Sequence, residues 1–183
     1  MTTAIPPLPY GTAEPRDAPG SWLLRYALPL PHPLDHVWAA VATPAGLSQW
    51  LAVPGPWDPH LDAPLAFTWH NADEEGEDAD EGPTVDEGRI TAWDPGRVAE
   101  YTLALHGRAR FRLEPDGPSA TFLRLTNEVR DLDASARDSR LASWHHHLEQ
   151  LASALTGHPA DRPARSRTRY RELLAEYASR GPA

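Results

Sequence analysis

The sequence predicts a single α+β domain in which a curved antiparallel sheet wraps round a long helix close to the C-terminal end. Two patterns predict it. From Asp133 to Leu155, apolar residues recur at steps of three and four, the spacing of one face of an α-helix. The middle of the chain instead alternates apolar and polar residues between turn signals, which is typical of antiparallel strands. At 183 residues the chain is long enough for one substantial core.

The first elements follow from alternation and from proline. Residues 1–20 hold prolines without periodicity, so we expect a disordered or loosely attached arm. Residues 22–30 alternate and predict a strand that the following prolines end. Residues 33–42 predict a short helix. A second short helix is expected over 43–51, since Thr43 and Pro44 form a start signal. Residues 54–59 predict an irregular link.

Five further strands are expected in the middle of the chain, with a hairpin about His106 and Gly107. They cover residues 65–69, 88–93, 98–105, 108–113 and 121–129. Alternation places one set of side chains on the inner face of the sheet: Tyr101, Leu103, Leu105, Ala109, Phe111, Leu113, Leu123, Leu125 and Val129. Arg108, Arg110 and Arg112 then stand on the outer face. A solvated row with cross-strand ion pairs is the main interpretation of these arginines, and an anionic-ligand site is the alternative.

The long helix at 133–155 carries three consecutive histidines, and Gly157 suits its C-cap. At about 100° per residue, His145 and His147 flank the apolar stripe, while His146 falls nearly opposite and should be exposed. Three consecutive helical histidines cannot converge on one metal ion, so no metal site is predicted. A final helix is expected over 166–179. The sequence does not decide whether it docks on the body or on a second subunit in a homodimer.

Composition excludes several kinds of chemistry. The chain has no cysteine and no lysine, which removes thiolate catalysis, cysteine-bound metals and lysine Schiff bases. We expect a cytoplasmic protein, because no signal peptide or membrane span is visible in the sequence. No cofactor is predicted. The net charge of -9 argues against nucleic-acid binding. Nine acidic residues gather between 73 and 87, so residues 71–87 predict a solvated acidic loop, which lacks the spacing of a calcium-binding EF-hand.

Three stretches resemble one known family. Residues 36–50 (HVWAAVATPAGLSQW) look like the opening signature of the START-like (SRPBCC) superfamily, and are most similar to bacterial homologues of the heat-shock-chaperone ATPase activator. Residues 87–90 together with residues 94–98 resemble the middle strands of that family, and residues 144–151 (WHHHLEQL) its closing helix. The resemblance covers about residues 22–157. It implies a helix-grip fold over 21–157, after the arm at 1–20 and before a C-terminal extension at 158–183.

The resemblance also implies an apolar cavity between the long helix and the sheet. The residues expected to line it are Trp50, Trp69, Tyr101, Leu103, Phe111, Trp144, His145 and Leu148. The leading hypothesis is non-catalytic binding of an apolar or amphipathic small molecule there. One alternative is an enzyme like the polyketide cyclases and aromatases, with His145, Tyr101 and Arg124 as its polar groups. The other alternative is an interaction protein that contacts a chaperone or partner through the acidic loop or the last helix.

Overall fold

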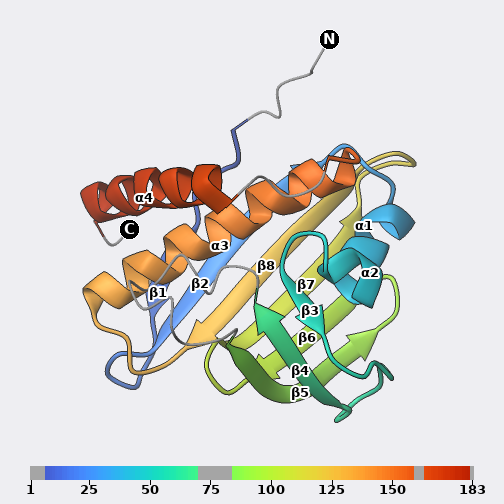
Figure 1. Ribbon diagram of the computed structural model, residues 1–183, viewed down its shortest axis with the longest axis horizontal. Coiled ribbons are helices and arrows are strands. Elements are labelled where there is room, and N and C mark those ends of the chain that lie inside the picture. Colours follow the sequence, from blue (N-terminus) through green and yellow to red (C-terminus); the bar gives the residue numbers. More distant parts are fainter. Residues whose placement is uncertain (1–6, 70–83, 159–162, 182–183) are drawn as a thin grey trace.

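Eight strands form one antiparallel sheet in the computed structural model, which describes residues 7–69, 84–158 and 163–181 (Figure 1). Their order across the sheet is β1-β2-β8-β7-β6-β5-β4-β3. The strands are β1 (Thr12–Pro15), β2 (Trp22–Leu30), β3 (Ala52–Pro54), β4 (Pro64–Trp69), β5 (Val85–Asp94), β6 (Val98–Leu103), β7 (Gly107–Pro115) and β8 (Thr121–Val129). The predicted α+β class and the antiparallel sheet are confirmed. Strand β3 was not predicted, since it lies at the edge of a proline-rich link.

Four helices accompany the sheet in the described part of the chain: α1 (Leu34–Ala42), α2 (Pro44–Leu47), α3 (Ala134–Leu155) and α4 (Pro163–Arg180). Helix α3 runs along the concave side of the sheet, as predicted, and α4 lies along α3 on its other side (Figure 1). Helices α1 and α2 lie beside the end of the sheet that is away from α4 (Figure 1). None of these helices combines the length and apolar character needed to cross a membrane.

Local side chains fix the helix ends. The Asp133 carboxylate accepts the Ala136 N–H at 2.8 Å and caps α3. The Thr43 hydroxyl accepts the Gly46 N–H at 3.1 Å and caps α2. Gly46 is required here because a Cβ at this position would stand 2.1 Å from the Ala39 carbonyl oxygen. Helix α2 ends at Leu47, four residues earlier than expected, and turns carry the chain on to Leu51.

The inner face of the sheet and the apolar stripe of α3 share the core. Trp144 of α3 lies 6.1 Å from Phe111 of β7 and 6.3 Å from Trp69 of β4, measured between ring centroids. The other predicted inner-face residues are buried except Leu105, which is 58% exposed. The expectation for Leu105 was wrong because β6 ends at Leu103 and the chain turns there, which breaks the alternation.

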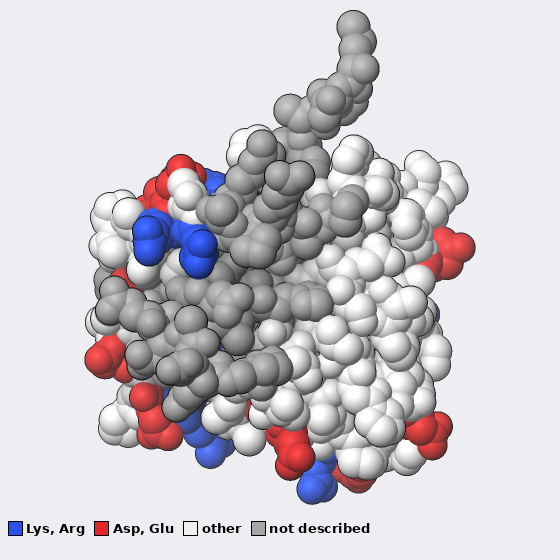
Figure 2. Space-filling model, in the orientation of Figure 1, with Lys and Arg blue, Asp and Glu red and all other residues white. Residues whose placement is uncertain are grey.

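The outer face carries the predicted arginine row. Arg108 pairs with Glu128, while Arg110 pairs with Glu100 at 3.1 Å and Arg112 with Glu114 at 3.1 Å. Three strands thus supply the acids that neutralise the row, so the main interpretation of a solvated face with ion pairs is confirmed. Figure 2 shows a different surface over α1, α2 and β3, where few charged side chains are visible.

The N-terminal segment differs from the expected loose arm where the structure describes it. Residues 12–15 form β1, which pairs with β2 from Thr12 opposite Arg25 to Pro15 opposite Trp22. Next to it, the Gly11 N–H donates to the Tyr177 hydroxyl at 2.8 Å. Pairing of the main chain at a sheet edge needs no side-chain alternation, so the sequence pattern gave no sign of this strand.

The acidic segment also begins and ends differently. Residues 70–83, most of the predicted acidic loop, lie outside the described residues. Asp86 and Glu87 belong instead to β5, and Asp86 is 1% exposed. A buried acidic residue inside a strand is unusual and requires hydrogen-bond partners.

Helix α4 docks on the body of its own chain. Leu173 is fully buried, and Tyr170 and Tyr177 are nearly so. On the α3 side, Glu149 receives the Arg169 guanidinium at 2.7 Å. This contact answers the question left open by the sequence, because the apolar face of α4 is used within the chain.

Candidate functional site

The interior between α3 and the sheet is lined by aromatic rings from several elements. Trp50, just after α2, approaches Phe111 at 6.0 Å between ring centroids, and Tyr101 lies 6.0 Å from the same ring. Phe67 and Trp69 of β4 complete the group at 6.0 Å from each other. Of the residues predicted to line a cavity, Trp50, Trp69, Tyr101, Leu103, Phe111, Trp144 and Leu148 are all buried in this core.

His145 lies elsewhere than expected. Its Nδ1 is 2.8 Å from the Tyr177 hydroxyl of α4, and its ring centroid is 5.0 Å from that of Tyr10. Its Nε2 faces Glu149 at 3.6 Å. Burial lowers the pKa of His145 to about 4 against the opposing effect of Glu149, so the ring is neutral at pH 7. His145 of α3 therefore contacts both α4 and the N-terminal segment.

His146 is 4% exposed, so the expected exposure was wrong. The helical wheel accounted for a single packed face, whereas α3 is covered by the sheet on one side and by α4 on another. The Nε2 of His146 is 3.0 Å from the Gln150 amide nitrogen. His147 points toward α2, with its Nδ1 3.1 Å from the Trp50 carbonyl oxygen. The three histidines thus point in three directions, as predicted, and each contacts a different neighbour.

The residues suspected for a cyclase do not meet. The Tyr101 hydroxyl donates to the Val41 carbonyl oxygen at 2.8 Å inside the core, while Arg124 lies on the outer face, 3.7 Å from Glu114. His145 belongs to the α4 contact. Among the described residues, no group of three His, Asp or Glu side chains is placed to hold a metal ion.

A histidine that the sequence analysis treated as a turn residue has a carboxylate partner. His106, between β6 and β7, places its Nδ1 2.6 Å from Asp86 Oδ2. Asp86 also accepts the backbone N–H groups of Leu105 at 2.9 Å and His106 at 3.1 Å. Burial raises the pKa of Asp86, but these hydrogen bonds outweigh it and the net pKa is lowered, so the carboxylate is ionised. Asp86 holds both the hairpin turn and the imidazole.

The His106 ring stacks on Trp69, with centroids 3.9 Å apart and planes at 28°. Across the hairpin, Asn127 of β8 donates from Nδ2 to the His106 carbonyl oxygen at 2.9 Å and accepts the Trp144 indole N–H at 2.9 Å. Asn127 occupies an inward position of β8 and is fully buried. A polar residue at an inward strand position is the signal in the sequence that marks Asn127, and it was not among the predicted site residues.

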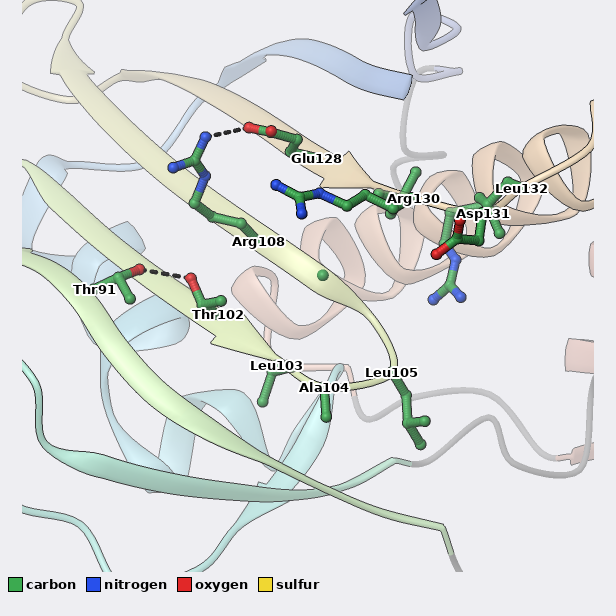
Figure 3. A pocket seen from close by; sticks show the side chains of 13 residues that line it. Thr91, Thr102, Leu103, Ala104, Leu105, Arg108, Glu128, Arg130, Asp131 and Leu132 are labelled. Atoms are coloured by element: carbon green, nitrogen blue, oxygen red, sulfur yellow. Dashed lines mark hydrogen bonds and ion pairs between the residues drawn. The ribbon is translucent and has the colours of Figure 1, made fainter. Parts of the chain in front are cut away.

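A pocket of about 600 Å³ opens on the other side of this hairpin, between β6, β8 and the start of α3 (Figure 3). Thr91 and Thr102 share a hydrogen bond at one wall, and Arg108 pairs with Glu128 at another (Figure 3). Leu103 is the one predicted cavity residue in its lining. The pocket is open and mixes polar with apolar side chains in its lining, which differs from the enclosed apolar cavity expected from the resemblance.

Comparison with solved structures supports the fold. The protein encoded by gene BPP1335 of Bordetella parapertussis has 22% identity and a TM-score of 0.68, covering 97% of this chain and 95% of that one. CalU16 from Micromonospora echinospora has 18% identity and a TM-score of 0.66, covering 92% and 95%. DynU16, a putative protein in the dynemicin biosynthetic locus, has 19% identity and a TM-score of 0.59, covering 79% and 49%.

Sequence comparison identifies the family. A search of curated proteins gives no significant match. The family model described as "Activator of Hsp90 ATPase homolog 1-like protein" matches residues 31–156, which is more than half of the chain. The matched range begins just before α1 and ends with α3. It therefore includes the aromatic interior together with Asp86, His106 and Asn127. The chain belongs to the Activator of Hsp90 ATPase homolog 1-like family, within the START-like (SRPBCC) superfamily.

Proposed function

We propose that this protein binds an apolar or amphipathic small molecule between α3 and the sheet, without catalysing a reaction on it. The supporting observation is the concentration of aromatic rings there: Trp50, Trp69, Tyr101, Phe111 and Trp144 come from five separate parts of the chain and face one another. Aromatic side chains give large apolar contact areas to a ligand, with binding specificity left to a few polar groups.

The structural neighbours agree with this proposal at the level of fold. CalU16 and DynU16 share the fold, and DynU16 is described as a putative protein of a biosynthetic locus. The cyclase alternative has less support, since Tyr101 is engaged in the core and Arg124 lies on the outer face. The partner-binding alternative relied on the acidic loop, whose residues 70–83 are not described, and on the last helix, whose apolar face is docked.

Native mass spectrometry of freshly purified protein tests the proposal. We expect a bound species whose extra mass disappears when the protein is denatured in organic solvent. A protein that carries no extra mass, and that gains none after exposure to aromatic compounds, would refute small-molecule binding.

A variant that fills the interior supplies a second test. Ala109 is a small, buried residue of β7 opposite Tyr101 and Asn127. If a ligand occupies space there, Ala109→Leu should fold normally and lose the bound species. If the interior is already filled by side chains, the same change should cost about 1–3 kcal/mol of stability through overpacking. Ala27→Leu is the matched control, because Ala27 is exposed on β2.

A further inference from the structure

Trp69 holds a buried hydrogen-bond donor that nothing in the described residues satisfies. The residue is 7% exposed, and its indole Nε1 has no acceptor among residues 7–69, 84–158 and 163–181. The indoles of Trp22, Trp50 and Trp144 do have acceptors: the carbonyl oxygen of Leu132 at 3.2 Å, that of Ala40 at 2.9 Å and Asn127 Oδ1 at 2.9 Å. An unpaired buried donor is costly and rare in native proteins, so a ligand or water that supplies the acceptor is the usual explanation.

The ring stacked on Trp69 presents the complementary group. The ionised Asp86 carboxylate only accepts hydrogen bonds, so the His106 Nδ1 that faces it carries a proton. In the tautomer protonated at Nδ1 alone, Nε2 is a hydrogen-bond acceptor. Within the described residues Nε2 has no hydrogen-bond partner. The side chain of His106 is 19% exposed, so this pair of rings lies where the interior meets the surface.

The position of His106 is rigidly held. Asp86 binds the turn through two backbone N–H groups, and Asn127 binds the His106 carbonyl oxygen. Gly107 completes the turn with φ +72, and a Cβ there would stand 2.2 Å from the Glu128 carbonyl oxygen. A donor and an acceptor that are fixed before binding lose little entropy when a ligand arrives.

We propose that Trp69 and His106 form the polar end of the ligand site and select hydroxylated aromatic molecules, an inference that rests on the proposed function. A phenolic hydroxyl can accept from Trp69 Nε1 and donate to His106 Nε2, since it has one hydrogen and two lone pairs. The aromatic body of the ligand would lie against Phe67, Trp144 and His147, whose ring centroids are 5.9–6.3 Å from that of Trp69.

Binding of 2-naphthol, 2-methoxynaphthalene and naphthalene, measured by isothermal titration calorimetry, tests this inference. Without polar partners the hydroxyl would weaken binding, because it must leave water. With them, 2-naphthol should bind about threefold to tenfold more tightly than naphthalene, the range expected for one or two net hydrogen bonds. The methoxy compound accepts but cannot donate, so its affinity should fall between the other two.

Trp69→Phe keeps an aromatic side chain, smaller than the indole, and removes the N–H, so it should abolish most of the preference for 2-naphthol. Trp93→Phe is the control, because Trp93 packs against Trp38 and Trp57 away from His106. Should Trp69→Phe fold poorly, the wild-type protein still gives a readout: the Trp69 indole N–H resonance should move most on addition of 2-naphthol.

The outcomes separate the two proposals. Equal affinity for 2-naphthol and naphthalene, or a preference that persists in Trp69→Phe, would overturn the selection of hydroxyl groups while leaving small-molecule binding in place. If none of the three compounds binds although native mass spectrometry shows a bound species, the selection of hydroxylated aromatic molecules fails while the proposed function stands.

Discussion

Asn127→Ala should reduce the unfolding free energy by about 3–5 kcal/mol, because one buried carboxamide binds three polar groups. Its Nδ2 donates to the carbonyl oxygens of His106 at 2.9 Å and Arg108 at 3.3 Å, and its Oδ1 accepts from Trp144 Nε1 at 2.9 Å. Asn127 and Trp144 are 0% and 2% exposed, so water cannot replace these contacts without a change in packing.

The largest contribution comes from the indole. Leaving the Trp144 N–H buried and unpaired costs about 1–3 kcal/mol. The shorter bond to a backbone carbonyl adds about 1 kcal/mol, and the longer one adds little. The small void left by truncation adds about another 1 kcal/mol.

Urea unfolding at pH 7 measures the loss, with Thr126→Ala as the control on the neighbouring, half-buried outer position. We expect the control to change stability by less than about 0.5 kcal/mol. In a Trp144→Phe background the indole N–H no longer exists, so Asn127→Ala should cost about 1–2 kcal/mol less than in the wild type. Strictly additive losses would refute the link between Asn127 and Trp144.

Three further measurements test the titration of Asp86, the titration of His145 and the docking of α4. The pKa of Asp86 lies below its ordinary value of 3.8, so its stabilisation is present above that pH and is lost as the pH falls through the folded value. Thermal melts should therefore show a steeper loss below about pH 4 in the wild type than in Asp86→Asn, and parallel losses would contradict this. Burial lowers the pKa of His145 from 6.5 to about 4, so the wild type should lose stability as the pH falls through that window. His145→Gln should lose less there, and an unchanged slope would count against a neutral His145. Finally, Leu173→Ala should cost about 2–5 kcal/mol and the half-buried neighbour Leu174→Ala clearly less, whereas equal small losses would mean that α4 is not docked in solution.

Helices and strands whose ends carry local start and stop signals could be predicted from the sequence. Strand β2 has the expected bounds, Trp22 to Leu30, because alternation defines its faces and the surrounding prolines end it. Helix α3 begins after the Asp133 cap and ends just before Gly157, which has φ +80. In both cases the determining interactions lie within a few residues of the sequence.

Features that depend on distant partners could not be predicted. His146 is buried because α3 has neighbours on more than one side, which a helical wheel of α3 alone cannot represent. Asp86 resembled one more acid of a solvated run, yet its partners lie about twenty residues ahead in the β6–β7 turn. His145 likewise meets Tyr177, thirty-two residues away. In each case a polar side chain is buried because a remote segment satisfies it.

The distribution of satisfied and unsatisfied polar atoms supports the proposed ligand site beside the β6–β7 hairpin. The three consecutive histidines are the most conspicuous motif, but His145 binds Tyr177, His146 contacts Gln150 and His147 contacts the Trp50 carbonyl oxygen. Such pairing recovers the cost of burying a polar ring and needs no ligand to explain it. Trp69 keeps its donor unpaired within the described residues, although an apolar aromatic side chain would avoid the cost of burying that donor. Retaining a destabilising polar atom at one end of an aromatic interior is what a recognition group requires. Ligand searches should therefore begin with hydroxylated aromatic compounds rather than with metal ions.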